Sequence, residues 1–239
     1  MLPVFLSAEW RKLIMINYEV DPAILQRYIP AGTELDFFEG KCLVSLVGFM
    51  FNETRIRGFR FPFHINFEEF NLRFYVKYLD NGKWKRGTVF ISEIVPKYMI
   101  SLVANTLYRE HYTCLPMQHK IIINDDSVQV SYSFKTKIGW NSVSATANAT
   151  AKSFLPGSLE EFITEHYFGY NRWDKNNTLE YGVEHPKWLT YELKSIEIKC
   201  KFEEIYPPEF VPFLYKPHHS ALLAEGSEVV VRKGRKILV

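Results

Sequence analysis

Three polar residues that could hold and activate a small molecule share one strand-like segment, residues 68–76. Glu69, Asn71 and Arg73 alternate there with apolar residues, so an extended strand would place all three on the same face. An arginine can grip a carboxylate with two parallel hydrogen bonds, and a glutamate can carry protons. This face would meet water on a half-exposed strand, whereas in a small barrel it would line a polar cavity.

A second segment, residues 91–97, contains Glu93 and Lys97 at a spacing of four. Both would lie on one face if the strand continues as far as the lysine, and the apolar residues on either side would place the amine where its charge is costly. Burial lowers the pKa of an amine and frees it to attack a carbonyl group, whereas a neighbouring carboxylate keeps it protonated. One interpretation is therefore a nucleophilic lysine with a proton-carrying glutamate, and the other is a surface ladder of ion pairs.

The chain lacks the motifs of several common classes of site. It contains no HExxH or paired CxxC motif for zinc, no GxSxG nucleophile motif and no glycine-rich phosphate loop. We therefore expect neither a metal nor a cofactor. Arginines mix with aromatic residues at 55–61, a pattern that would suit single-stranded nucleic acid. The formal net charge of only +2 favours a solvated loop instead, so no nucleic-acid partner is expected.

The length fits one large domain or two small ones, and because no repeat, low-complexity tract or linker divides the chain, one globular domain is expected over residues 1–239. Apolar residues make up 47% of the chain and charged residues 23%, which is ordinary for a protein with a packed core. Cys42, Cys114 and Cys200 lie far apart, a pattern typical of reduced thiols in the cytoplasm. The sequence shows neither an apolar run of membrane-spanning length nor a signal-peptide core, so no membrane partner is expected.

Apolar patterns predict a β-rich fold with few helices. Several segments alternate apolar and polar residues with the period of a strand, and one is apolar almost throughout. The predicted strands are 43–51, 68–76, 127–136, 141–151, 195–202 and a C-terminal hairpin over 228–239. Capping residues and apolar spacing predict helices at 21–29, 96–108 and 158–167. Many strands at short spacing indicate a barrel or a strongly curved sheet.

Short stretches over nearly the whole chain carry a resemblance to a known family. They include "NYEVDP", "GKCLVSLVGFMF", "FEEFNLRFYV", "RGTVFISEIVPK" and "SALLAEGSEVVV". The chain resembles the YqjF-like family of uncharacterised bacterial proteins, which is grouped with the acetoacetate decarboxylase superfamily. The resemblance implies a mainly β (α+β) fold, in which a closed or nearly closed antiparallel β-barrel with a few peripheral helices encloses a pocket. It also allows a homo-oligomer.

The same resemblance assigns roles to individual residues. Lys97 in "ISEIVPKY" takes the position of the amine that forms a Schiff base with a β-keto acid. Arg11 matches by position a residue that would hold the substrate carboxylate. Two departures accompany the match, because Tyr98 stands where the decarboxylases have a second lysine and Val47 stands where they have an acidic residue.

Two functions are therefore expected as alternatives. The first is a Schiff-base-forming, decarboxylase-like lyase that acts on a small oxo acid or carbonyl compound through Lys97. The second is a non-catalytic barrel that binds a small carboxylated or carbonyl-containing molecule, and it is favoured by Tyr98. The residues expected at the site are Lys97 and Glu93 for catalysis, and Arg11, Glu69, Asn71 and Arg73 for substrate binding.

Overall fold

The fold is built around a ring of strands that closes on itself. The computed structural model describes residues 2–238. In ring order the seven strands are β1 (Val4–Glu19), β3 (Leu43–Ile56), β4 (Phe67–Asp80), β5 (Lys83–Val95), β10 (Phe168–Arg172), β11 (Asn177–Glu184) and β13 (Ser220–Arg232). Each strand pairs with the next, and β13 pairs again with β1. The pairing of Val183 on β11 with Val231 on β13 completes the circle.

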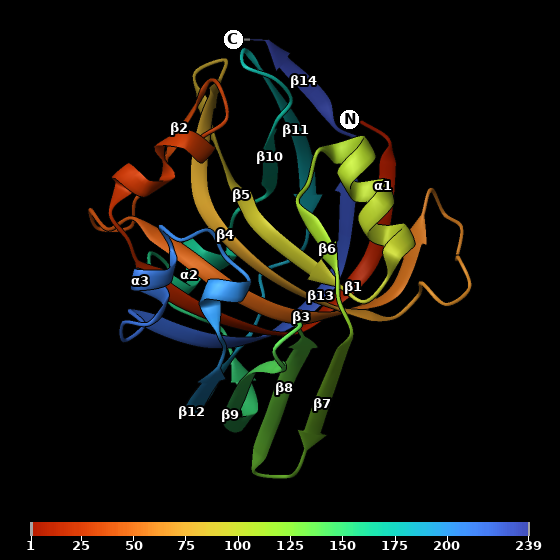
Figure 1. The fold of residues 1–239 in the computed structure, drawn as a ribbon, viewed down its shortest axis with the longest axis vertical. Helices are drawn as coiled ribbons and strands as arrows, with labels where there is room; N and C mark the ends of the chain where they lie inside the picture. The colour runs from red at the N-terminus through yellow and green to blue at the C-terminus, as the bar shows by residue number, and fades with distance from the viewer. Residues whose placement is uncertain (1, 239) are drawn as a thin grey trace.

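A second group of strands extends the sheet beyond the ring. After β13 the pairing continues through β12 (Thr190–Lys199), β9 (Trp140–Lys152), β8 (Ser127–Lys135) and β7 (Met117–Ile123). The ends of this group project at the bottom of Figure 1. The other short strands are β2 (Thr33–Leu35), β6 (Tyr112–Cys114) and β14 (Arg235–Leu238). The helices are α1 (Tyr98–Tyr108), α2 (Leu159–Thr164) and α3 (Val211–Leu214), with 3-10 turns at Pro22–Tyr28 and Phe202–Glu204.

These pairings confirm the predicted mainly β fold with few helices, and the sheet is closed. Two pairs depart from the antiparallel pattern expected throughout, because β5 runs parallel to both β10 and β6. Between β5 and β10 the chain passes through α1, the strands β6 to β9 and α2, and between β5 and β6 it passes through α1. A parallel partner needs a long connection of this kind, whereas an antiparallel one can follow a tight turn.

The C-terminal segment is not the predicted hairpin. Strands β13 and β14 both pair with β11 rather than with each other. Val231 lies opposite Val183, and four residues later Arg235 lies opposite Glu180. The chain therefore continues in one direction along β11 and is only interrupted near Gly234. A glycine within a strand can mark an interruption of the pairing as well as a turn, so the sequence pattern did not distinguish the two.

Two of the predicted helices are shorter or tighter than expected. Residues 22–28 form a 3-10 turn, and Asp21 caps it by accepting a hydrogen bond from the backbone N–H of Ala23 at 2.8 Å. This 3-10 run of seven residues is longer than the usual length of about three or four, and Pro30 follows its end. The helix expected over 158–167 is confined to α2, and its predicted cap Ser158 is present.

The ring wall separates two apolar cores. On β4, Phe70 and Leu72 face outward and belong to the core shared with the second group of strands, where Phe70 packs against Phe134 with ring centroids 5.0 Å apart. The alternate residues of β4 face the interior of the ring, where residues of β1 and β3 form the other core. The alternation therefore places Glu69 and Arg73 inside the ring.

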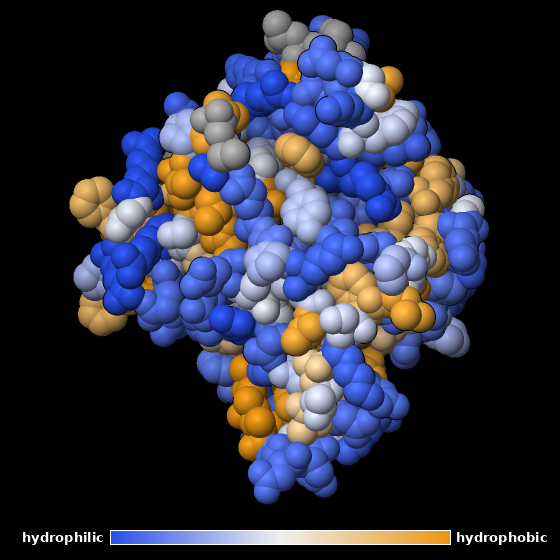
Figure 2. All heavy atoms as spheres, turned by 180° about the vertical axis from the view of Figure 1, so that it is seen from behind, coloured by the Kyte–Doolittle hydropathy of each residue, from blue (hydrophilic) through white to orange (hydrophobic). Residues whose placement is uncertain are grey.

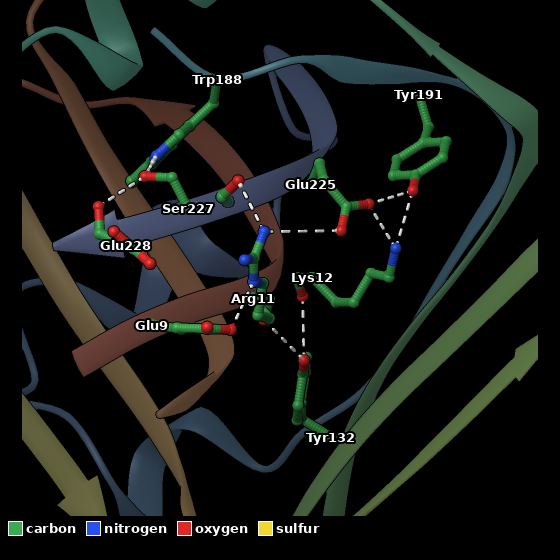
Figure 3. A network of polar contacts seen from close by, with 10 residues as sticks. Glu9, Arg11, Lys12, Tyr132, Trp188, Tyr191, Glu225, Ser227 and Glu228 are labelled. Carbon is green, nitrogen blue, oxygen red and sulfur yellow. Dashed lines mark hydrogen bonds and ion pairs between the residues drawn. The ribbon is translucent and has the colours of Figure 1, made fainter. Parts of the chain in front are cut away.

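A bulge in β1 places a lysine in a polar cluster on the other side of the wall, shown in Figure 3. Lys12 has a φ of 55°, and the register between β1 and β3 shifts between Arg11 and Ile14. The Nζ of Lys12 donates to the hydroxyl of Tyr191 at 2.7 Å and pairs with the carboxylate of Glu225 on β13. Because Lys12 is only 8% exposed, its charge depends on that carboxylate.

Replacing Glu225 with alanine is expected to lower the free energy of unfolding by about 2 kcal/mol, because the buried amine of Lys12 then loses its carboxylate partner, which is itself 29% exposed. Urea unfolding at neutral pH measures the change. Glu184→Ala is the matched control, because Glu184 pairs with Arg232 at the surface, where an ion pair contributes less than about 1 kcal/mol. Equal losses in the two variants would contradict this interpretation of the Lys12 cluster.

The surface is mostly hydrophilic on the face shown in Figure 2, with separate apolar patches. One patch lies on the projecting end of the molecule, where the second group of strands ends. Ile123 at the end of β7 is exposed. No helix within the described residues is long and apolar enough to cross a membrane. The single-domain organisation and the cytoplasmic location stay predictions.

Candidate functional site

The interior of the ring contains a cavity of about 130 Å³. Strands β1, β3, β4, β5, β11 and β13 all contribute to its wall, and α1 adds Ala104 and Tyr108. Much of the wall is aromatic, including Trp10 and Phe49. An apolar cavity of about 150 Å³ can hold benzene, so this cavity suits a ligand of similar size. The titratable side chains that line it are Glu69, Arg73, Glu93, Tyr108, Glu110, Tyr112, His166 and Tyr181.

Three glutamates from different elements are brought together here. Glu69 comes from β4, Glu93 from the neighbouring strand β5, and Glu110 from the segment between α1 and β6. In the register of the two strands, Asn71 lies opposite Glu93. The glutamates are 3%, 1% and 9% exposed respectively. Ionised carboxylates are costly in such a place, so the cavity strongly affects their protonation.

Burial and mutual repulsion raise the pKa of these carboxyl groups. Burial raises the pKa of Glu69 to about 7, and the charge of Glu110 adds to this, although the hydrogen bonds from Asn71 and Tyr112 act in the opposite direction. The pKa of Glu93 is raised well above its ordinary value, first by burial and then by the charges of Glu110 and Glu69. Burial also raises the pKa of Glu110. The cluster therefore keeps protons near neutral pH that a surface glutamate would have lost.

Two tyrosines hold the carboxyl groups in place. The hydroxyl of Tyr112 on β6 donates to Glu69 Oε2 at 2.8 Å, and the hydroxyl of Tyr181 on β11 donates to Glu110 Oε1 at 2.7 Å. The backbone of Gly169 lies against the ring of Tyr181, and a Cβ at Gly169 would come within 2.1 Å of that ring. Only glycine leaves room for the tyrosine there, so Gly169 helps to position Glu110 through Tyr181.

A cationic group lines the cavity farther along β4. The Nη2 of Arg73 donates to the backbone oxygen of Ile163 in α2 at 3.1 Å. His166 follows α2 and also lines the cavity, and burial lowers the pKa of its imidazole to about 4. Its Nε2 lies 3.2 Å from Asp36 Oδ2. The cavity thus has a guanidinium toward α2 and carboxyl groups toward β6.

Several polar atoms on the wall have no hydrogen-bond partner among the described residues. Asn71 Oδ1 and Glu110 Oε2 are acceptors of this kind, although Asn71 Nδ2 donates to Glu69 Oε1 at 2.9 Å. Arg73 Nε and Trp10 Nε1 are donors of this kind. Buried polar groups are rarely left unpaired in folded proteins. Their concentration around one cavity indicates a place for a polar molecule.

Four of the residues predicted from sequence line the cavity, namely Glu69, Asn71, Arg73 and Glu93. Lys97 is not part of the described lining. It is half buried and forms the N-cap of α1. Strand β5 ends at Val95 and the chain bends at Pro96, so the alternation of faces does not continue to Lys97, although the backbone of Lys97 is itself extended. The chemical roles given to these residues stay predictions.

Arg11 also lies outside the described lining. Its Nε donates to Glu9 Oε2 at 3.0 Å, within the cluster of Figure 3. Trp10 before it and Leu13 after it both line the cavity, because the bulge between them places two residues on the other side of the wall. Among the described lining residues the guanidinium belongs to Arg73, whereas the resemblance implied that of Arg11.

Sequence patterns did not identify Glu110, Tyr112, His166 and Tyr181 as site residues. Glu110 and Tyr112 lie where α1 gives way to a three-residue strand, and such a segment has no periodicity to read. His166 follows a helix of six residues, which is also too short for its periodicity to indicate which side chains face the interior. The alternation of Leu179, Tyr181 and Val183 is visible in the sequence and could have placed Tyr181 on an interior face. This alternation does not show that Tyr181 contacts Glu110.

Sequence comparison gives two matches over most of the chain. The family DUF2071, described as an uncharacterised conserved protein, matches residues 7–228. The uncharacterised protein YqjF of Bacillus subtilis (strain 168) is 27% identical over 216 residues, which cover 86% of this chain and 84% of YqjF.

Three solved structures are similar over 99% of this chain. Acetoacetate decarboxylase from Legionella pneumophila has a TM-score of 0.65 at 14% identity, with 88% of that chain covered. An acetoacetate decarboxylase-like enzyme from Sphingomonas wittichii RW1 has a TM-score of 0.65 at 12% identity, with 94% covered. The enduracididine biosynthesis enzyme MppR complexed with pyruvate has a TM-score of 0.66 at 11% identity, with 91% covered. This similarity shows an acetoacetate decarboxylase-like fold.

Proposed function

The chain belongs to the DUF2071 family, and we propose that it is an acetoacetate decarboxylase-like enzyme that transfers protons to and from a small oxo acid or carbonyl compound. The size of the cavity and its unpaired polar atoms support a small polar ligand. One protein of similar fold holds pyruvate, which is a small oxo acid. The proposal retains the cytoplasmic location suggested by the three separate cysteines.

The observation that carries the proposal is the carboxyl cluster, and above all Glu69. Its pKa of about 7 means that the protonated and ionised forms are both populated near neutral pH. A group of this kind is well suited to general acid–base catalysis. As a base, Glu69 would take a proton from the carbon beside a carbonyl group, and the electron pair would move onto the carbonyl oxygen. The unpaired Nε of Arg73 would stabilise the charge that develops there.

Deuterium exchange tests this chemistry without knowledge of the natural substrate. The protein is incubated in D₂O with 2-oxobutanoate, acetoacetate and acetone, and NMR follows the exchange at the carbon beside the carbonyl group. Glu69→Gln is expected to lower the protein-catalysed rate by about 100-fold, because the amide cannot accept the proton. Glu68→Gln is the matched control, because Glu68 lies next to it on β4 but contacts His119 at 2.7 Å on the other side of the wall. Equal losses in both variants would contradict the role of Glu69.

A Schiff base at Lys97 is the further step that the fold family suggests. The amine would add to the carbonyl carbon, water would leave, and the iminium would accept an electron pair when carbon dioxide departs. Lys97 is half buried at the start of α1, the helix that supplies Tyr108 to the cavity wall. Formation of the imine requires the amine to reach a ligand in the cavity.

Borohydride trapping tests this step. Reduction in the presence of an oxo acid converts an imine into a stable adduct, which peptide mass spectrometry can place. A saturable adduct on Lys97 that is absent in Lys97→Arg is expected, whereas Lys216→Arg, at an exposed lysine, should leave it unchanged. Deuterium exchange without an adduct on Lys97 would exclude the imine and leave the carboxyl groups as the catalysts. Binding without either reaction would favour the non-catalytic barrel, which also accounts for Tyr98.

A further inference from the structure

The cavity contains more carboxyl groups than cations. Glu69, Glu93 and Glu110 line it together with a single guanidinium among the described lining residues, that of Arg73. A ligand that is only an anion would favour the protonated forms of these carboxyl groups, because like charges interact strongly in an enclosed site. A protonated amine can instead take the place of a proton in the cluster, and so allow a carboxyl group to ionise.

The unpaired atoms point to the same ligand chemistry at the carboxyl end. Asn71 Oδ1 is an acceptor, Glu110 Oε2 is an acceptor when that carboxyl group is ionised, and both residues are more than nine-tenths buried. Asn71 is tied to Glu69 through its other side-chain atom, so its free oxygen lies beside the carboxyl groups. An ammonium group has three donors and no acceptor, and it therefore complements a set of free acceptors.

The arginine end requires the opposite partner. The unpaired Nε of Arg73 is a donor, and Arg73 is only 8% exposed. Glu69 and Arg73 are four residues apart on β4, which separates their Cα atoms by about 13 Å and leaves Asn71 between them. A short ligand along this strand would present different groups to its two ends.

We propose that the cavity accepts a small amino-carbonyl compound, with a protonated amine among Glu69, Glu93 and Glu110 and a carbonyl or carboxylate oxygen at Arg73. This inference rests on the proposed function and narrows its substrate class. It differs from the expectation of a simple oxo acid, because an oxo acid has no cation to pair with a carboxyl group that ionises. The aromatic residues of the cavity wall suit the short carbon chain of such a ligand.

Isothermal titration calorimetry with three probes of matched chain length tests this inference. The probes are 4-aminobutanoate, butanoate and butylamine, titrated into the full-length protein at neutral pH. We expect 4-aminobutanoate to bind at least about 10-fold more tightly than either single-ended probe, because only it pairs both ends of the cavity. Glu110→Gln should weaken the binding of both amines without weakening that of butanoate. Arg73→Met should weaken the binding of 4-aminobutanoate and leave that of butylamine, and Glu68→Gln should change none of the three.

Butanoate that binds as tightly as 4-aminobutanoate would overturn the inference, and so would the absence of binding by both amines. The wild-type comparison decides this even if a variant fails to fold. The two proposals can also fail separately. A preference for 4-aminobutanoate without catalysed deuterium exchange would support the proposed ligand class and contradict the proposed enzyme function. Catalysed exchange of 2-oxobutanoate without a preference for an amine would support the enzyme function and contradict the ligand class.

Discussion

Replacing Gly226 with alanine is expected to lower the free energy of unfolding by about 4 kcal/mol. Gly226 has a φ of 81°, and a Cβ there would lie 1.9 Å from the backbone oxygen of Trp10. Arg11 and Gly226 are partners in the pairing of β1 with β13, so this oxygen cannot move aside as a flexible side chain can. The expected loss combines about 1–2 kcal/mol for a left-handed backbone with about 1–3 kcal/mol for the overcrowded contact.

Gly182→Ala provides the control for this prediction. Gly182 lies on β11 within the same ring, and the nearest atom to a Cβ there would be Arg232 Cγ at 3.5 Å, an ordinary contact. Urea unfolding should show a change of less than about 1 kcal/mol for this variant. A loss in Gly226→Ala that is no larger than this would show that β1 and β13 can separate at little cost.

Replacing Glu69 with glutamine is expected to stabilise the protein by about 3 kcal/mol at pH 8 and to have no comparable effect at pH 4. Burial raises the pKa of this carboxyl from 4.5 to about 7 in the folded state. The unfolded chain therefore loses this proton first as the pH rises, and the folded state loses stability between about pH 4.5 and 7. Glutamine has no proton to lose in this range, so the variant avoids the loss.

Urea unfolding of wild type and variant at pH 4, 6 and 8 measures this difference. Glutamine can still accept from Asn71 Nδ2 and donate to the hydroxyl of Tyr112, so the hydrogen bonds at this position can be kept. Glu68→Gln, on the other side of the wall, should not reproduce the gain at high pH. A gain for Glu69→Gln that is the same at all three pH values would show that ionisation is not its cause. Together with the deuterium-exchange experiment, we therefore expect Glu69→Gln to be more stable but less active than the wild type.

The sequence by itself determined which residues of β4 share a face. The period of a strand is two, so Glu69, Asn71 and Arg73 had to lie together, opposite Phe70 and Leu72. The many alternating segments likewise determined a mainly β fold, and the stretches shared with a known family indicated that the sheet closes. These conclusions depend on local spacing or on resemblance, and neither requires knowledge of which distant segments meet.

The tertiary structure decided the composition of the site. Glu110 and Tyr181 are 71 residues apart in the chain, and they meet because β11 closes the ring beside the segment after α1. Arg11 lies outside the cavity because it follows Trp10, and the bulge adds Lys12 on the same side. The end of β5 separates Lys97 from the face of Glu93. Each result depends on strand pairing or on a place where the pairing is broken. A bulge adds one residue to a strand, and so changes the face on which the following side chains lie. Periodicity along the chain cannot report such an event, because it assumes that the strand is unbroken.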